Sequence, residues 1–204
     1  MAQQISYLAL GDSYTIGEAV EQSASFPYQL AALLREKGLE IDEPKVIAKT
    51  GWTTDELKQA IKQERITETY GLVTLLIGVN NQYRGYSPEA YKQEFNELLK
   101  IAIGFAGGTK QNVYVVSIPD WGVTEFAKQS GRNLQTISEE IDVFNEINKQ
   151  VTTANEVTYV DITAASRAAV NDNSLIANDG LHPSGKMYQH WAKELVVAIT
   201  RPSK

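Results

Sequence analysis

The sequence contains no cysteine and only two histidines. The lack of cysteine excludes disulfide scaffolds, thiolate metal sites, iron–sulfur clusters and cysteine nucleophiles. Two histidines outside any His-Glu-x-x-His motif are also too few recognisable ligands for a metal hydrolase, so no metal site is expected. An imidazole that accepts protons near neutral pH therefore has two candidates, His182 and His190.

Long apolar runs and basic runs are missing as well. The longest strongly apolar stretch, 72–79, is far shorter than the roughly 20 residues of a membrane helix. No signal peptide precedes the first apolar run, so the default expectation is a cytoplasmic protein, although a secreted protein that has lost its leader would read the same. Nineteen Lys and Arg against 25 Asp and Glu give a net charge of −6 with no basic cluster, so no nucleic-acid partner is expected.

What is present is the composition of an ordinary globular protein. The chain has 204 residues, of which 43% are hydrophobic and 22% charged. Its length fits one domain, and no repeat, low-complexity segment or linker interrupts it. Residues 1–204 are therefore predicted to form a single domain, whose oligomeric state the sequence leaves open.

Apolar runs of strand length alternate with longer stretches in which apolar residues recur every three or four positions. This alternation predicts a doubly wound α/β fold, in which helices cover a parallel sheet. A break between helix and strand is expected at Gly107-Gly108, and a surface loop at 129–135. The strands are expected at 5–10, 45–48, 72–77, 112–117 and 157–160, and the main helices at 26–37, 54–64, 88–102, 136–152 and 184–199.

Polar residues follow several of the predicted strands. In open sheets of this kind ligands bind outside the carboxyl ends of the strands, so these loops are the candidates for a functional site. Three of these loops supply a hydroxyl, a backbone N–H that no side chain shields, and a carboxamide. A further loop near the C-terminus supplies a carboxylate and an imidazole. These groups belong to Ser13, Gly51, Asn80, Asp179 and His182.

These groups are the parts needed for acyl transfer. A serine hydroxyl becomes a useful nucleophile when an imidazole takes its proton, and a carboxylate fixes the imidazole tautomer. His182 and Asp179 suit these two roles, while Gly51 and Asn80 could donate hydrogen bonds to the developing oxyanion. His190 lies within the last predicted helix and is expected to be a partly exposed helix residue.

Four segments of the chain match a known family. Gly11-Asp12-Ser13, Gly51, Gly78-Val79-Asn80 and the segment 179–183 (Asp-Gly-Leu-His-Pro) come in the order of the four blocks of the GDSL or SGNH hydrolases, which the chain resembles over residues 8–183. The resemblance implies the three-layer α/β/α SGNH fold with a five-stranded, flavodoxin-like parallel sheet. It also implies cofactor-free hydrolysis of small-molecule carboxylic esters or thioesters, such as lipids, lysophospholipids or acylated carbohydrates. The residues it implies are a Ser13, Asp179, His182 triad, and an oxyanion hole of the Ser13 and Gly51 amides with the Asn80 side chain.

Two residues depart from the family pattern. Tyr14 stands where the family name has Leu, outside the chemical roles, and is expected to tune packing or the acyl pocket. Asn81 stands where the third block usually has Asp, which removes a carboxylate from the loop that holds Asn80. Asp12 is adjacent to Ser13 and is expected to cap a helix or form an Asx turn rather than to join the triad.

The main alternative is a flavodoxin-like module without hydrolase activity. The hydroxyls after the first strand could cradle the phosphate of a flavin at a helix N-terminus, with Trp52 and Trp121 beside the ring. This interpretation gives no role to Asp179 or His182. Trp121 and Trp52 are equally compatible with simple packing.

Two other known motifs, the P-loop of nucleotide-binding proteins and the serine elbow of α/β-hydrolases, are not matched by the sequence. The segment 180–187 has most of the P-loop spacing, but Met187 replaces the hydroxyl residue that holds Mg²⁺ and Pro183 lacks an amide hydrogen. The Pro and the following Ser184 are expected to begin the last helix. An ordinary α/β-hydrolase is disfavoured because the sequence has no Gly-x-Ser-x-Gly elbow.

Overall fold

Five parallel strands form the centre of the protein in a computed structural model that describes residues 4–201. The strands are β1 (Tyr7–Gly11), β2 (Lys45–Ala48), β3 (Leu72–Leu76), β4 (Val113–Val116) and β5 (Thr158–Val160). They lie in the order β2-β1-β3-β4-β5, and Leu8 of β1 is paired with both Lys45 of β2 and Val73 of β3. This is the flavodoxin-like order, which confirms the predicted fold class.

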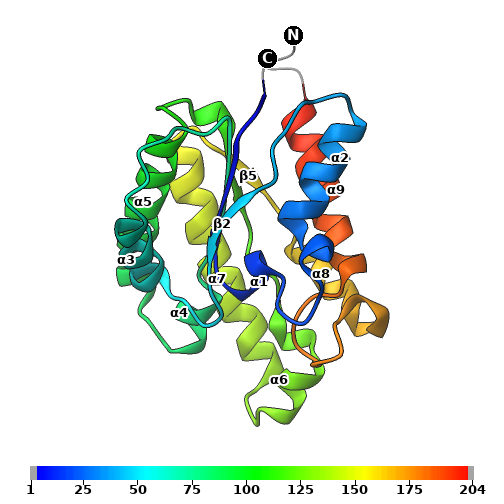
Figure 1. The fold of residues 1–204 in the computed structure, drawn as a ribbon. Coiled ribbons are helices and arrows are strands. Elements are labelled where there is room, and N and C mark those ends of the chain that lie inside the picture. Colours follow the sequence, from blue (N-terminus) through cyan, green and yellow to red (C-terminus); the bar gives the residue numbers. More distant parts are fainter. Residues whose placement is uncertain (1–3, 202–204) are drawn as a thin grey trace.

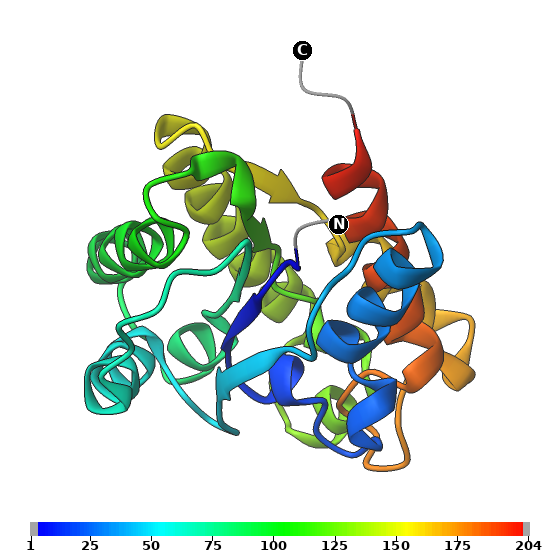
Figure 2. The ribbon, with the colours of Figure 1, turned by 45° about the horizontal axis from the view of Figure 1, so that its top comes forward.

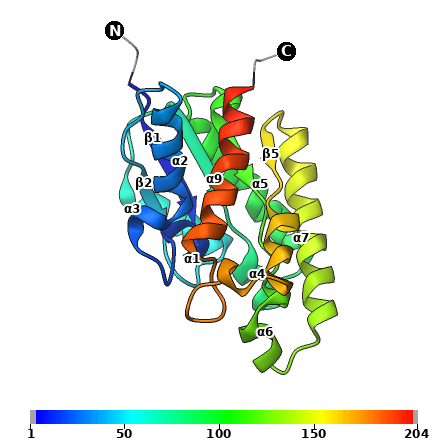
Figure 3. The ribbon, with the colours of Figure 1, turned by 90° about the vertical axis from the view of Figure 1, so that its right-hand side faces the viewer.

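Helices cover both faces of the sheet and complete a three-layer structure (Figures 1 and 2). On one face α2 (Phe26–Glu36) packs along α9 (Gly185–Thr200), as Figure 3 shows. The other face carries α3 (Thr54–Glu64), α5 (Pro88–Phe105) and α7 (Leu134–Ala154), with α5 in contact with both neighbours. Across residues 4–201, every helix is too short or too polar to cross a lipid bilayer.

Short helices occupy the connections. The α-helical ones are α1 (Ser13–Ile16), α4 (Val79–Tyr83), α6 (Glu125–Gln129) and α8 (Thr163–Arg167). The 3₁₀ turns are η1 (Gln22–Ala24), η2 (Lys110–Asn112), η3 (Trp121–Val123), η4 (Ala168–Val170) and η5 (Asn173–Leu175). In Figure 1, α1, α4 and α6 lie at the lower end of the molecule, where the strands end. The four short α-helices are therefore elements of the loops that follow the strands.

The central strands are buried on both faces. Every residue of β1 and β3 is buried, whereas the edge strands β2 and β5 each have partly exposed positions. Continuous apolar runs suit this environment because helices cover both sides of the sheet. β4 is likewise buried throughout, so the two strands whose ends lead to Ser13 and Asn80 belong to the buried centre of the sheet.

An aromatic cluster joins α9 to the first turn after β1. Trp191 of α9 is fully buried, with ring centroids 5.0 Å from Tyr188, 6.4 Å from Phe26 and 6.3 Å from Tyr14. Tyr188, Trp191 and Leu195 are all buried and form the inner face of this helix. The cluster fixes the start of α9, and with it the preceding loop, against the end of β1.

The predicted elements are present, with differences at their ends. β1 begins two residues later than expected and α5 extends to Phe105, while Gly107 and Gly108 form the predicted break with φ of +62° and +83°. The predicted surface loop at 129–135 is too long, because α6 ends at Gln129 and α7 begins at Leu134. The side chain of Asn133 accepts a hydrogen bond from the Thr136 N–H and caps α7 earlier than the apolar spacing indicated.

Candidate active site

The candidate residues lie in loops at the carboxyl edge of the sheet. Ser13 follows β1, Gly51 follows β2 and Asn80 follows β3, while Asp179 and His182 lie in the loop before α9. Because β2 and β3 flank β1, the three loops after these strands are neighbours. The order of the parallel strands reverses at β1, because β2 lies on one side of it and β3, β4 and β5 follow on the other, so this is the switch point at which ligands of doubly wound folds bind.

A tight turn presents Ser13 at the first position of α1. A side chain at Gly11 would collide with Thr15 Oγ1 and the Leu76 carbonyl oxygen, so the turn needs glycine there. Asp12 is the N-cap, and its Oδ1 accepts a hydrogen bond from the Tyr14 N–H at 3.0 Å. This confirms the expected capping role of Asp12, separate from the triad.

The Asp12 carboxyl is itself unusual. It is fully buried, and its Oδ2 has no hydrogen-bond partner within residues 4–201. Burial raises its pKa to about 7, with the Tyr14 N–H bond opposing the rise. The nucleophile candidate therefore follows a carboxyl that changes its charge near neutral pH.

Asp179 and His182 form a bonded pair. Asp179 Oδ2 lies 2.6 Å from His182 Nδ1, and Oδ1 accepts the N–H groups of Leu181 and His182 at 3.0 Å each. Partial burial raises the pKa of Asp179, but these three hydrogen bonds lower it more, so it remains below its ordinary value. An ionised Asp179 holds the proton on Nδ1 and leaves Nε2 of a neutral imidazole able to accept one.

The Asp179–His182 loop meets the serine turn. The rings of His182 and Tyr14 are 5.7 Å apart in an edge-on arrangement, and Tyr14 is the residue after Ser13. Both Ser13 and His182 are buried, with 5% and 8% of their surface exposed. No hydrogen bond links the Ser13 hydroxyl to any residue within 4–201. His190, by contrast, is exposed on α9, as expected.

The loops carrying Gly51 and Asn80 are bonded to each other. Asn80 Nδ2 donates to the Trp52 carbonyl oxygen at 3.0 Å, which leaves its second amide hydrogen free for another acceptor. Gly51 has a φ of +85°, a conformation that favours glycine. The Thr50 hydroxyl bonds to Glu18, in the loop after α1, and so ties this segment to the serine turn.

Asn81 braces the same junction in the place of the usual Asp. Its Oδ1 accepts the Thr54 N–H at 3.0 Å, and its Nδ2 donates to Thr54 Oγ1 at 2.7 Å. The Thr54 hydroxyl donates in turn to Glu94. A carboxylate at position 81 could not donate to Thr54, so the carboxamide fits this network better than the residue it replaces.

The sequence-based alternatives find little support in the geometry. Trp121 is buried, and its Nε1 donates to Gln82 Oε1 at 2.8 Å, so its packing role prevails and its ring is not free to stack on a flavin. Lys186 Nζ is bonded to Asp172 and Ser174, each at 2.8 Å, instead of facing a phosphate site. Ser184 caps α9 by accepting the Met187 N–H, as expected.

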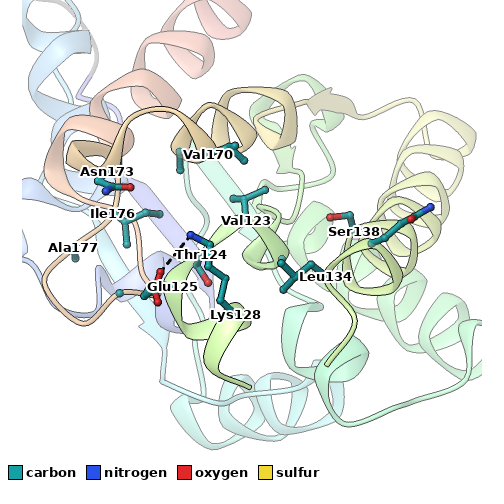
Figure 4. A pocket seen from close by; sticks show the side chains of 14 residues that line it. Val123, Thr124, Glu125, Lys128, Leu134, Ser138, Val170, Asn173, Ile176 and Ala177 are labelled. Atoms are coloured by element: carbon teal, nitrogen blue, oxygen red, sulfur yellow. Dashed lines mark hydrogen bonds and ion pairs between the residues drawn. The ribbon is translucent and has the colours of Figure 1, made fainter. Parts of the chain in front are cut away.

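A cavity of about 510 Å³ lies behind the loop that holds Asp179 and His182 (Figure 4). Ala177 and Gly180 of this loop form part of its wall, and the Gly180 carbonyl accepts the Phe126 N–H of α6 at 3.0 Å. The volume is in the range of small-molecule sites. The apolar part of the lining consists mainly of Val123, Leu134, Val170 and Ile176.

The parallel sheet and the polar loops at its carboxyl edge define a doubly wound α/β protein, and the family match makes it a carboxylic ester hydrolase. Comparison with known sequences gives the particular group: the chain belongs to the GDSL-like lipase/acylhydrolase family, whose profile matches residues 9–190. The resemblance found in the four sequence blocks is thereby confirmed. No curated protein is significantly similar to the chain in sequence.

Solved structures share the fold. A lipase/acylhydrolase from Enterococcus faecalis has a TM-score of 0.73 at 19% identity, covering 98% of this chain and 99% of its own. An acetylxylan esterase from Geobacillus stearothermophilus has a TM-score of 0.74 at 18% identity, covering 97% and 95%. The psychrotrophic esterase EstA from a Pseudoalteromonas species has a TM-score of 0.67 at 16% identity, covering 95% and 96%. At these identities the likeness concerns the fold.

Proposed function

We propose that the protein hydrolyses small carboxylic esters or thioesters through a Ser13, His182, Asp179 triad within a single catalytic domain. The observation that carries the proposal is the Asp179–His182 pair at 2.6 Å, packed through Tyr14 against the serine turn. This pair supplies an oriented base whose other nitrogen is free to accept a proton. Ser13 is buried, which distinguishes it from the many serines that lie on a protein surface in contact with water and supports a role in catalysis.

The reaction follows from these groups. Ser13 Oγ attacks the carbonyl carbon of the substrate while His182 Nε2 takes the hydroxyl proton, and Asp179 stabilises the imidazolium. The amides of Ser13 and Gly51 and the free amide hydrogen of Asn80 donate to the oxyanion. The bond to the alcohol or thiol then breaks, with its proton supplied by His182. Water, deprotonated by His182, cleaves the acyl-serine and restores Ser13.

The Ser13 hydroxyl has no hydrogen bond among residues 4–201, and this is compatible with the mechanism. Bonds between nucleophile and base are often long or poorly aligned without substrate and tighten in the complex. A change of the Ser13 χ1 rotamer moves its oxygen without moving the backbone. The edge-on contact between His182 and Tyr14 keeps the imidazole at the same turn meanwhile.

Hydrolysis of a short-chain p-nitrophenyl ester tests the triad. Ser13→Ala and His182→Ala are each expected to lower kcat by about 10³-fold or more, because such groups act as a unit. His190→Ala is the matched control, since it removes the other imidazole from an exposed position. Near-wild-type activity of either triad variant, or an equal loss in the control, would refute the assignment.

The substrate's larger group is proposed to occupy the cavity behind the Asp179–His182 loop. Its mixture of aliphatic side chains with the Glu125–Lys128 ion pair and Ser138 suits an uncharged group with one apolar side. A panel of p-nitrophenyl esters of increasing chain length, with acetylated xylan and lysolipid, distinguishes an acyl chain from a sugar. Flavin absorbance in the purified protein, with hydrolysis unaffected by Ser13→Ala, would favour the binding-module alternative.

A further inference from the structure

Arg84 connects the two segments that carry the proposed oxyanion donors. It is the C-cap residue of α4, four residues after Asn80, and therefore lies near the same face of this short helix. Its Nη2 donates to the Gly51 carbonyl oxygen at 2.6 Å, and its Nη1 to Glu56 Oε1 at 3.2 Å. One guanidinium thus bridges the loop after β2 and the first turn of α3.

Glu56 is a fixed anchor for this guanidinium. Its other oxygen, Oε2, accepts the backbone N–H of Thr53 at 2.9 Å and the Thr53 hydroxyl at 3.1 Å. The Thr53 N–H bond lowers the pKa of Glu56, partial desolvation opposes it, and the bond from Arg84 lowers it further. The carboxylate is therefore charged and tied to the helix start, so Arg84 is held at both ends.

Gly51 needs such a restraint. At a φ of +85° and without a side chain, it can reach many backbone conformations, which would change the direction of its N–H. The structure holds it on both sides: Thr50 bonds to Glu18, while the Gly51 carbonyl bonds to Arg84. The next carbonyl, that of Trp52, accepts the Asn80 side chain. Asn80 of α4 and Arg84 at its C-cap therefore hold successive carbonyls of this loop.

We propose that Arg84 is a positioning residue: it anchors the Gly51–Trp52 peptide through the Gly51 carbonyl, which limits rotation about the Gly51 backbone bonds and so holds the Gly51 N–H and the Asn80 carboxamide as one oxyanion-binding unit. This inference rests on the proposed ester hydrolysis. Preorganised donors stabilise the transition state because they need no rearrangement when the charge develops. Arginine suits the role better than lysine, because its planar fork can serve two separate acceptors in fixed directions.

The first test measures steady-state kinetics of Arg84→Met with a short-chain p-nitrophenyl ester. A small displacement of the oxyanion donors is expected to lower kcat about 10- to 100-fold with little change in KM. Arg84→Lys is expected to show most of this loss, because an ammonium group cannot span both acceptors. The concentration of active sites is measured by titration with a phosphonate ester, and kcat is calculated from it. A smaller fraction of folded protein in a variant then does not lower its kcat.

Arg35→Met is the matched control. Arg35 also joins a carbonyl oxygen, that of Ile41 at 2.9 Å, to a carboxylate, Glu43 at 2.8 Å, and its side chain is 39% exposed against 42% for Arg84. It lies on α2, away from the candidate donors. This variant is expected to keep the wild-type kcat, because it loses the same kind of surface contact elsewhere.

A double-mutant cycle separates positioning from a general structural effect. If Arg84 acts through the donors, Arg84→Met combined with Asn80→Ala should lose much less than the product of the two single losses. Fully multiplicative effects, an unchanged kcat in Arg84→Met, or a raised KM alone would each overturn the inference. If Ser13→Ala retains activity, the proposed function itself fails; if Ser13→Ala is inactive and Arg84→Met is normal, only the role of Arg84 fails.

Discussion

The buried Asp12 carboxyl predicts a pH dependence of stability that one substitution removes. In the unfolded chain Asp12 has an ordinary pKa near 3.8, whereas burial raises it to about 7 in the folded protein. Between these two values the folded state binds more protons than the unfolded state. The free energy of unfolding therefore falls as the pH rises through this window.

The size of the effect follows from the interval. Each pH unit within the window is worth at most about 1.4 kcal/mol, so the two units between pH 5 and 7 give about 2 to 3 kcal/mol. Asp12→Asn keeps an oxygen that can accept the Tyr14 N–H but carries no titratable group. From pH 5 to pH 8 the wild type should therefore lose about 2 to 3 kcal/mol of unfolding free energy that the variant keeps.

Urea unfolding followed by the fluorescence of the three tryptophans measures this difference at pH 5, 6, 7 and 8. Asp172→Asn is the control, because hydrogen bonds from Lys186 and then Ser174 lower the pKa of Asp172 to about 2, below the range measured. The control curve should run parallel to wild type. Parallel curves for Asp12→Asn and wild type would refute the raised pKa of Asp12.

Two further predictions concern the core and the cavity. Trp191→Ala removes the centre of the aromatic cluster and should lower the free energy of unfolding by about 3 to 5 kcal/mol in urea titrations, whereas a loss below 1 kcal/mol would contradict the packing described. Val170→Trp places a large ring at the cavity wall from a position that is 62% exposed, and should lower kcat/KM for long-chain more than for acetyl esters. Val143→Trp, on the exposed side of α7 and outside this cavity, should leave the chain-length profile unchanged.

The regular part of the fold was readable from the sequence because burial on both faces requires continuous apolar runs. The runs that became β3 and β4 are of this kind, and their order along the chain predicted the parallel sheet. The short helices α1 and α4 could not be found this way. They span only four and five residues, too few for a helical repeat of apolar positions to appear.

In the candidate site, too, some features could be predicted from the sequence and others could not. Ser13, Gly51 and Asn80 were found because they follow predicted strands, and the position of such loops is fixed by the topology of the sheet. The environment of Asp12 and the contacts of Arg84 depend on which groups surround them, and no pattern in the sequence records that. Once α4 is known, the four-residue spacing of Asn80 and Arg84 is a signal that places both near one loop.

The direction of β1 and α9 has a practical consequence for handling the protein. β1 starts at the edge of the sheet far from the candidate site, and α9 runs from the Asp179–His182 loop back to that edge, so the start of β1 and the end of α9 both lie there (Figure 1). Attachment of the protein to a bead or sensor surface near the start of β1 or the end of α9 would leave the candidate site turned outward. Immobilised and free protein should consequently turn over a dissolved ester at the same rate.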